Sequence, residues 1–173
     1  MNVEREIERV YQQVEERRID QAVMTCFRIA RSRNDFLSSA LFARHMHNSR
    51  DEAVRAIFDD IQNLKRRAQK FIWELANKRW LEARTLPFPI DEDDDGGDLA
   101  VMTWSAGDLA RRLETLEARI NDLTIPPGMG AFDTAAFTDR YTETKLLLRS
   151  QMDTIRNVQE KIGVACYEYA TRI

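Results

Sequence analysis

Residues that break helices are concentrated in the middle of the chain. All four prolines and five of the six glycines among the 173 residues lie between Pro87 and Gly130. The flanking segments carry apolar residues at spacings of three and four, which is the period of an amphipathic helix. We therefore expect an all-α fold: an elongated helical bundle with two long helices, three to four shorter ones and an acidic loop in the middle.

The N-terminal segment predicts three short helices and one long one. The stripe of the first helix consists of Val3, Ile7, Val10 and Val14. Asp20 either interrupts this helix or starts a second one, and a third, shorter helix is expected after Asn34. Ser49 followed by Glu52 is a capping-box pattern. It predicts a helix that begins there and, if it continues to Arg84, is on the order of 50 Å long.

The C-terminal segment predicts two further helices after a short extended piece at residues 99–104. Ser105 is a candidate N-cap, and the stripe behind it has the alternating spacing of a packing seam. This stripe consists of Leu109, Leu113, Leu116, Ile120 and Leu123. Asp133 is a candidate N-cap for a last helix of about 40 residues. The stripe of that helix consists of Phe137, Tyr141, Leu148, Ile155, Val158, Ile162, Ala165 and Tyr169.

The length of the chain suits a single helical domain at residues 1–173. It would contain N-terminal helices at 1–84, an acidic Pro/Gly loop at 85–98 and C-terminal helices at 99–173. The net charge of −3 divides into +4 for residues 1–84 and −7 for residues 85–173. Six acids between Asp91 and Asp98 supply most of the negative charge, so the acidity is confined to one loop. Of the 26 basic residues 21 are arginine, which favours contacts with carboxylates or phosphates.

The acidic loop contains the first half of an EF-hand calcium motif. Asp91, Asp93, Asp95 and Gly96 reproduce the pattern D-x-D-x-D-G. The second half is missing, because Met102 stands where a bidentate glutamate is required. A solvated acidic loop is therefore the favoured interpretation. A weak calcium site and a docking peptide for a basic partner are left as alternatives.

The histidines and cysteines predict no metal or cofactor site. On a helix, His45 and His47 would point about 200° apart and could not chelate one ion together, so we expect exposed or capping side chains. Cys26 and Cys166 each lie in an apolar-periodic segment. We expect two buried, reduced thiols, with a disulfide between them as an unsupported alternative.

No catalytic motif is present in the sequence. Gly128 and Gly130 precede a helix, but prolines stand before them in place of a strand and a third glycine is missing, so we interpret them as a helix–helix turn. A G-x-S-x-G elbow, a C-x-x-C pair and a Walker motif are absent. We therefore expect a protein that is not an enzyme and has no evident small-molecule substrate. The N-terminus lacks the core of a signal peptide, and no stretch approaches the roughly 18 apolar residues of a membrane span, so we expect a cytoplasmic protein.

A basic and aromatic segment at residues 65–79, with a tryptophan directly after it, is the candidate partner-binding site. Its members are Lys65, Arg66, Arg67, Lys70, Trp73, Lys78, Arg79 and Trp80. Such a patch suits contact with a nucleic-acid backbone, or with a protein that is anchored by the tryptophans. A solvated basic face beside a second buried seam is the simpler interpretation.

Several long apolar stripes in one small chain predict surplus apolar surface. We therefore expect a non-catalytic interaction or assembly protein, which self-associates or docks onto a larger complex through helix faces. The alternative is a helical accessory subunit that contacts nucleic-acid backbone through the basic patch. The stretch AVMTCFRIARSRND at residues 22–35 resembles helical accessory modules of bacterial antiphage systems. It contains no diagnostic motif, and no residue role is assigned from it.

Overall fold

The computed structural model describes residues 2–65, 67–69, 105–124 and 130–173, and every regular element within those ranges is a helix. The helices are α1 (Val3–Glu15), α2 (Ile19–Ser32), α3 (Phe36–Arg44), α4 (Glu52–Gln62), α7 (Ala106–Asp122) and α8 (Ala131–Arg172). The expected all-α class is confirmed. None of these helices, within the residues described, has an apolar stretch sufficient to cross a membrane.

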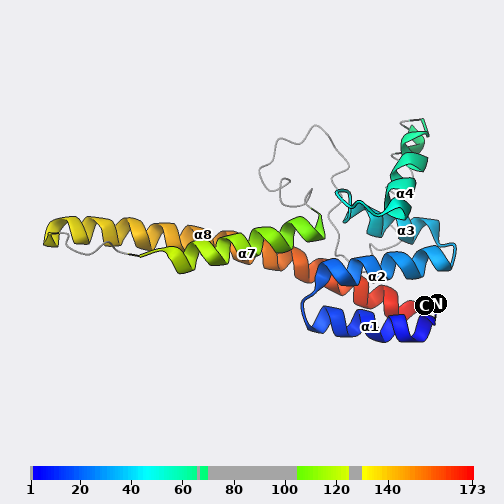
Figure 1. The fold of residues 1–173 in the computed structure, drawn as a ribbon, viewed down its shortest axis with the longest axis horizontal. Helices are drawn as coiled ribbons and strands as arrows, with labels where there is room; N and C mark the ends of the chain where they lie inside the picture. The colour runs from blue at the N-terminus through cyan, green and yellow to red at the C-terminus, as the bar shows by residue number, and fades with distance from the viewer. Residues whose placement is uncertain (1, 66, 70–104, 125–129) are drawn as a thin grey trace.

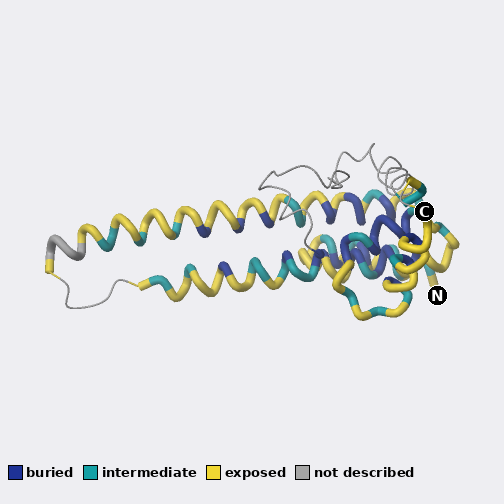
Figure 2. The backbone as a smooth tube through the Cα atoms, turned by 90° about the horizontal axis from the view of Figure 1, so that it is seen from above, coloured by how far each residue is buried: buried dark blue, intermediate teal, exposed yellow. Residues whose placement is uncertain are grey.

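The helices form a head and an arm (Figure 1). The head consists of α1 to α4 and the C-terminal part of α8, and both ends of the chain lie there. The arm consists of α7 and the remainder of α8, which run antiparallel and extend away from the head (Figure 2). Helix α8 therefore belongs to both parts of the molecule.

Helix α2 is the centre of the head, because α1, α3, α7 and α8 all contact it. Buried residues are distributed around most of its circumference, and they are Ile19, Ala22, Val23, Thr25, Cys26, Phe27, Ile29 and Ala30. Helix α8 approaches it closely at Gly163, where a Cβ atom would lie 3.0 Å from Cδ1 of Ile19. The ring of Phe42 from α3 packs edge-on against Tyr169 of α8, with the ring centroids 5.1 Å apart. Burial of these apolar side chains is the main force that holds α8 to the head.

The turns between the first three helices each contain a residue with positive φ. Helix α1 ends at Glu15, and Arg17 has φ 58°; α2 ends at Ser32, and Asn34 has φ 54°. The sequence left open whether Asp20 interrupts the first helix or starts a second one. The first helix ends before it, and Asp20 lies in the first turn of α2, after the N-cap Arg18. Left-handed backbone suits asparagine but is unfavourable for arginine, so residue type alone would not place a turn at Arg17.

The expected long helix from Ser49 to Arg84 is wrong in its first residue and in its length. The N-cap of α4 is Asp51, whose side chain accepts from the backbone N–H groups of Ala53 and Val54, whereas Ser49 accepts from Asp51. The helix ends at Gln62. The side-chain NH₂ of Gln69 donates to the backbone carbonyls of Gln62 and Leu64, at 3.2 and 2.8 Å, and so satisfies carbonyls at the helix end. Residues 70–84 lie outside the described residues.

The two helices of the arm begin differently from each other. Ser105 is the N-cap of α7, as expected, and it forms a capping box with Asp108. The N-cap of α8 is Gly130, so the expected cap at Asp133 is wrong and that residue lies inside the helix. With 42 residues, α8 is about 63 Å long, against about 26 Å for the 17 residues of α7.

Candidate functional site

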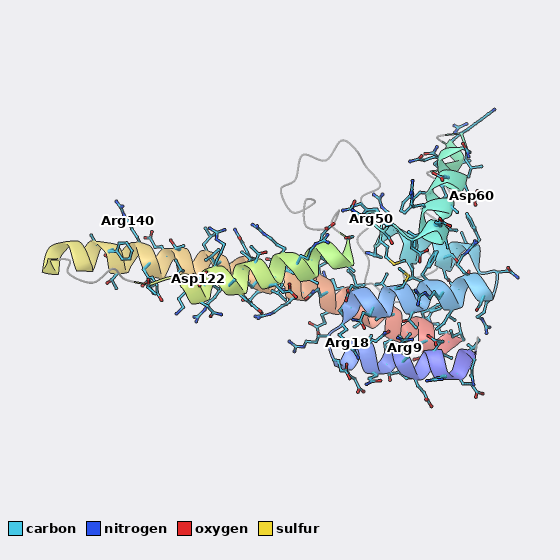
Figure 3. All side chains as sticks on the ribbon, viewed as in Figure 1. Arg9, Arg18, Arg50, Asp60, Asp122 and Arg140 are labelled. Carbon is cyan, nitrogen blue, oxygen red and sulfur yellow. The ribbon has the colours of Figure 1, made fainter. Side chains whose placement is uncertain are left out.

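Part of α8 extends beyond the end of α7. Arg156 of α8 donates to Glu117 of α7 at 3.3 Å, and Met152 and Ile120 line a common surface cavity, which fixes the register of the arm. Helix α7 therefore covers α8 only from about Leu148 onward, and Leu148 is the first buried residue of α8 among those whose side chains are described. We call residues 131–147 the overhang. Figure 3 shows Arg140 on this part of α8, beyond Asp122 at the end of α7.

Large apolar side chains occur on the overhang without being buried. Leu146 and Leu147 are each 61% exposed, the highest values among the exposed large apolar residues of the described chain. Phe137 and Tyr141 are half-buried, and the ammonium of Lys145 lies 5.6 Å from the ring centroid of Tyr141. A cluster of exposed apolar residues on a projecting helix is typical of a binding surface.

The second feature is a polar cavity in the head, with a volume of about 420 Å³. Its walls come from α1, α2, the turn between α3 and α4, and the first turn of α7. The start of α7 is anchored beside it, because the backbone N–H of Ala106 donates to the carbonyl of His45 at 2.8 Å and Asn48 donates to Asp108 at 2.7 Å. We call this feature the head cavity.

Two ionisable groups near the head cavity have shifted pKa values. Burial, together with the positive charges of Arg44 and His47, lowers the pKa of His45 to about 4, so the imidazole is neutral at pH 7. Partial burial by itself would raise the pKa of Asp108, but hydrogen bonds from Ser105, Arg111 and Asn48 outweigh that effect and lower the pKa of Asp108 to about 2. Asp108 is therefore a fixed negative charge at the start of α7, where the helix dipole also favours one.

The sequence-predicted residues are placed as follows. His45 is buried and is the C-cap of α3, while His47 is exposed. The expectation of exposed or capping histidines is therefore confirmed: His45 is the capping residue and His47 the exposed one. Cys26 and Cys166 are buried and form no disulfide, as expected. The thiol of Cys26 donates a hydrogen bond to the backbone carbonyl of Cys166 at 3.7 Å. Burial and this neighbour raise the pKa of Cys26 well above its usual value.

Most of the candidate partner-binding patch lies outside the described residues. Lys65 and Arg67 are described, and both are exposed. The remaining members, Arg66, Lys70, Trp73, Lys78, Arg79 and Trp80, lie outside, as do the candidate calcium ligands Asp91, Asp93 and Asp95. Within the described part of the chain, no group of three or more histidine, cysteine or acidic side chains is placed to hold a metal ion.

Sequence reasoning did not identify either the overhang or the head cavity. The stripe on α8 was visible, but periodicity does not show how far α7 would cover it. The described residues form a helical protein with a head, an arm and a helix end that α7 does not cover. No protein-family model, no curated protein and no solved structure matches the chain.

Proposed function

We propose that this chain is a non-catalytic interaction protein, which pairs with a second copy of itself through the overhang of α8. The observation that carries the proposal is the 61% exposure of Leu147 on a helix segment that α7 does not cover. In proteins most of the stability of a helix comes from the packing of its amphipathic face, so the overhang gains stability from a packing partner.

The spacing of residues on the overhang suits pairing with an identical copy. Phe137, Arg140, Thr144 and Leu147 follow at intervals of three, four and three, which places them along one side of the helix. In an antiparallel pair centred between Arg140 and Thr144, Phe137 of each copy lies across from Leu147 of the other. Arg140 then lies across from Thr144 and beside Glu143, a residue of opposite charge. The described part of the overhang carries two acids and two bases, so two copies do not repel each other.

Substituting Leu147 by glutamine is expected to dissociate this pair. Burial of a leucine side chain contributes about 1.5–3 kcal/mol, and the symmetry of the pair removes two of them, so the dissociation constant should rise at least about 100-fold. Light scattering coupled to size exclusion, over a concentration series, measures the change from two chains to one. Glutamine retains helix propensity, so circular dichroism should report unchanged helicity.

The matched control is Leu146→Gln. Leu146 is as exposed as its neighbour but lies on the opposite side of α8 from Phe137, so this substitution should leave the pair intact. A wild-type chain that is monomeric at every concentration contradicts the proposal. Equal dissociation by both substitutions contradicts the proposed side of the helix.

The compartment and the alternative function belong to the same proposal. The free thiols of Cys26 and Cys166 support the expectation of a cytoplasmic protein, because reducing compartments preserve such thiols.

Contact with nucleic-acid backbone through residues 65–79 stays a prediction, since Lys65 and Arg67 are the only members of this patch that are described and exposed. Binding to DNA or RNA that weakens steeply with added salt would support it.

A further inference from the structure

The floor of the head cavity is made of buried polar side chains. Four of the polar residues that are buried in the described part of the chain line it: Gln13, Thr25, His45 and Ser105. The hydroxyl of Thr25 lies 2.9 Å from Oε1 of Gln13 and 3.0 Å from the carbonyl oxygen of Gln21, so its one hydrogen is shared between two acceptors. Buried polar groups cost free energy unless they are hydrogen-bonded, and a cavity lined by such groups suits a polar occupant.

The amide of Gln13 lies on this floor. Gln13 is only 3% exposed, its Oε1 accepts from Thr25, and no described residue accepts from its side-chain NH₂. Gln13 also lines the cavity. The side-chain NH₂ of Gln13 has two N–H bonds and is a hydrogen-bond donor. A molecule in the cavity that carries an acceptor could bind to it.

Three arginines from three different helices line this cavity. Arg9 comes from α1, Arg28 from α2 and Arg111 from α7, while Asp20 is the one carboxylate among the described residues of the wall. Arg9 has a long ion pair with Glu6 at 3.8 Å, and Arg111 pairs with Asp108. Arg28 forms no ion pair with any other described residue. Acids next to the wall therefore offset the charges of Arg9 and Arg111, and Arg28 is the guanidinium that is available to an anion.

The first turn of α7 brings backbone into the wall of the cavity. Gly107 lies in the wall, and a Cβ atom placed on it would meet only the hydroxyl of Ser105, at 3.9 Å, so a ligand can approach the backbone closely there. Asp108 already supplies the negative charge that the start of this helix favours, so the turn contributes an open approach and no positive charge. The imidazole of His45 is neutral and does not contribute charge.

We propose that the head cavity binds a small phosphorylated molecule, with Arg9, Arg28 and Arg111 around the phosphate groups and Gln13 donating to a polar acceptor. A volume of about 420 Å³ accommodates a small metabolite. The planar guanidinium suits the paired oxygens of a phosphate, and groups from three helices suit a ligand with more than one charge. This site is independent of the proposed pairing through the overhang.

Isothermal titration of the full chain with pyrophosphate, inorganic phosphate and citrate tests the proposal. Pyrophosphate is expected to bind more tightly than phosphate, because it can contact more than one arginine, and more tightly than citrate, which carries carboxylates. Arg28→Gln should weaken pyrophosphate binding about tenfold or more, as expected for the loss of a charge-assisted hydrogen bond. The control is Arg31→Gln on the same helix, outside the cavity wall, which should change the affinity less than about twofold.

Three results would overturn the proposal. The first is no binding of pyrophosphate to the wild-type chain. The second is equal weakening of binding by Arg31→Gln and Arg28→Gln, which would mean attraction to net charge alone. The third is tighter binding of citrate than of pyrophosphate, which would exclude phosphate as the recognised group. Gln13→Met serves as a second variant, since it keeps the volume of the side chain but removes the donor. It should weaken binding while the melting temperature of the free protein reports whether the head remains folded.

Discussion

Replacing Phe42 by alanine is expected to lower the free energy of unfolding by about 4 kcal/mol. Phe42 is 1% exposed, and its ring packs against Tyr169, so the substitution leaves a cavity between α3 and α8 and removes an aromatic contact. The loss is large because this side chain joins two elements that are far apart in sequence. Urea denaturation followed by circular dichroism measures it as a shift of the midpoint.

Phe36→Ala provides the comparison for this experiment. Phe36 lies on the same helix but is 36% exposed, so its removal should cost less than about 1.5 kcal/mol. If the two substitutions destabilised the protein equally, the packing of α3 against α8 would not be a main source of stability in the head.

Acidification from about pH 6.5 to below about pH 4 is expected to remove about 3 kcal/mol of stability through His45 alone. Burial, with the charges of Arg44 and His47, lowers the pKa of this imidazole from 6.5 to about 4 in the folded chain. Between these two values the unfolded chain binds a proton that the folded chain does not. The contribution is therefore fully present above pH 6.5 and is lost as the pH falls toward 4.

Denaturant titrations at several pH values measure this slope. His45→Gln should flatten it between pH 6.5 and 4, whatever the absolute stability of the variant, because the titrating group is gone. His47→Gln should leave most of the slope in place, since burial is the largest cause of the lowered pKa of His45 and this substitution leaves His45 buried. An unchanged slope in His45→Gln would mean that another group carries the acid sensitivity.

The helical class and most helix positions could be predicted because they depend on local patterns. Apolar spacing located α1, α7 and α8, and Ser105 identified the start of α7 through its capping hydroxyl. The turn at Arg17 could not be predicted, because arginine has no preference for left-handed backbone and tertiary packing imposes it. The end of α4 at Gln62 depends on the distant side chain of Gln69.

The candidate sites could not be predicted because they exist only in the folded chain. Arg9, Arg28 and Arg111 are separated by long stretches of sequence and form no motif, although the predominance of arginine over lysine was a signal toward anion contacts. Gly163 gave no sign that it lies against Ile19. The overhang depends on the register of α7 against α8, which the contact of Glu117 with Arg156 fixes.

The continuity of α8 has a consequence for how its two ends are related. Each residue of a helix advances the axis by about 1.5 Å and turns it by about 100°, so deletion of one residue near Asn157 would rotate Leu147 by roughly a quarter-turn relative to the head. Insertion of seven residues would lengthen the reach by about 10 Å while changing the angular phase by only about 20°. Variants of this chain that preserve the orientation of the free tip should therefore differ in length by whole heptads.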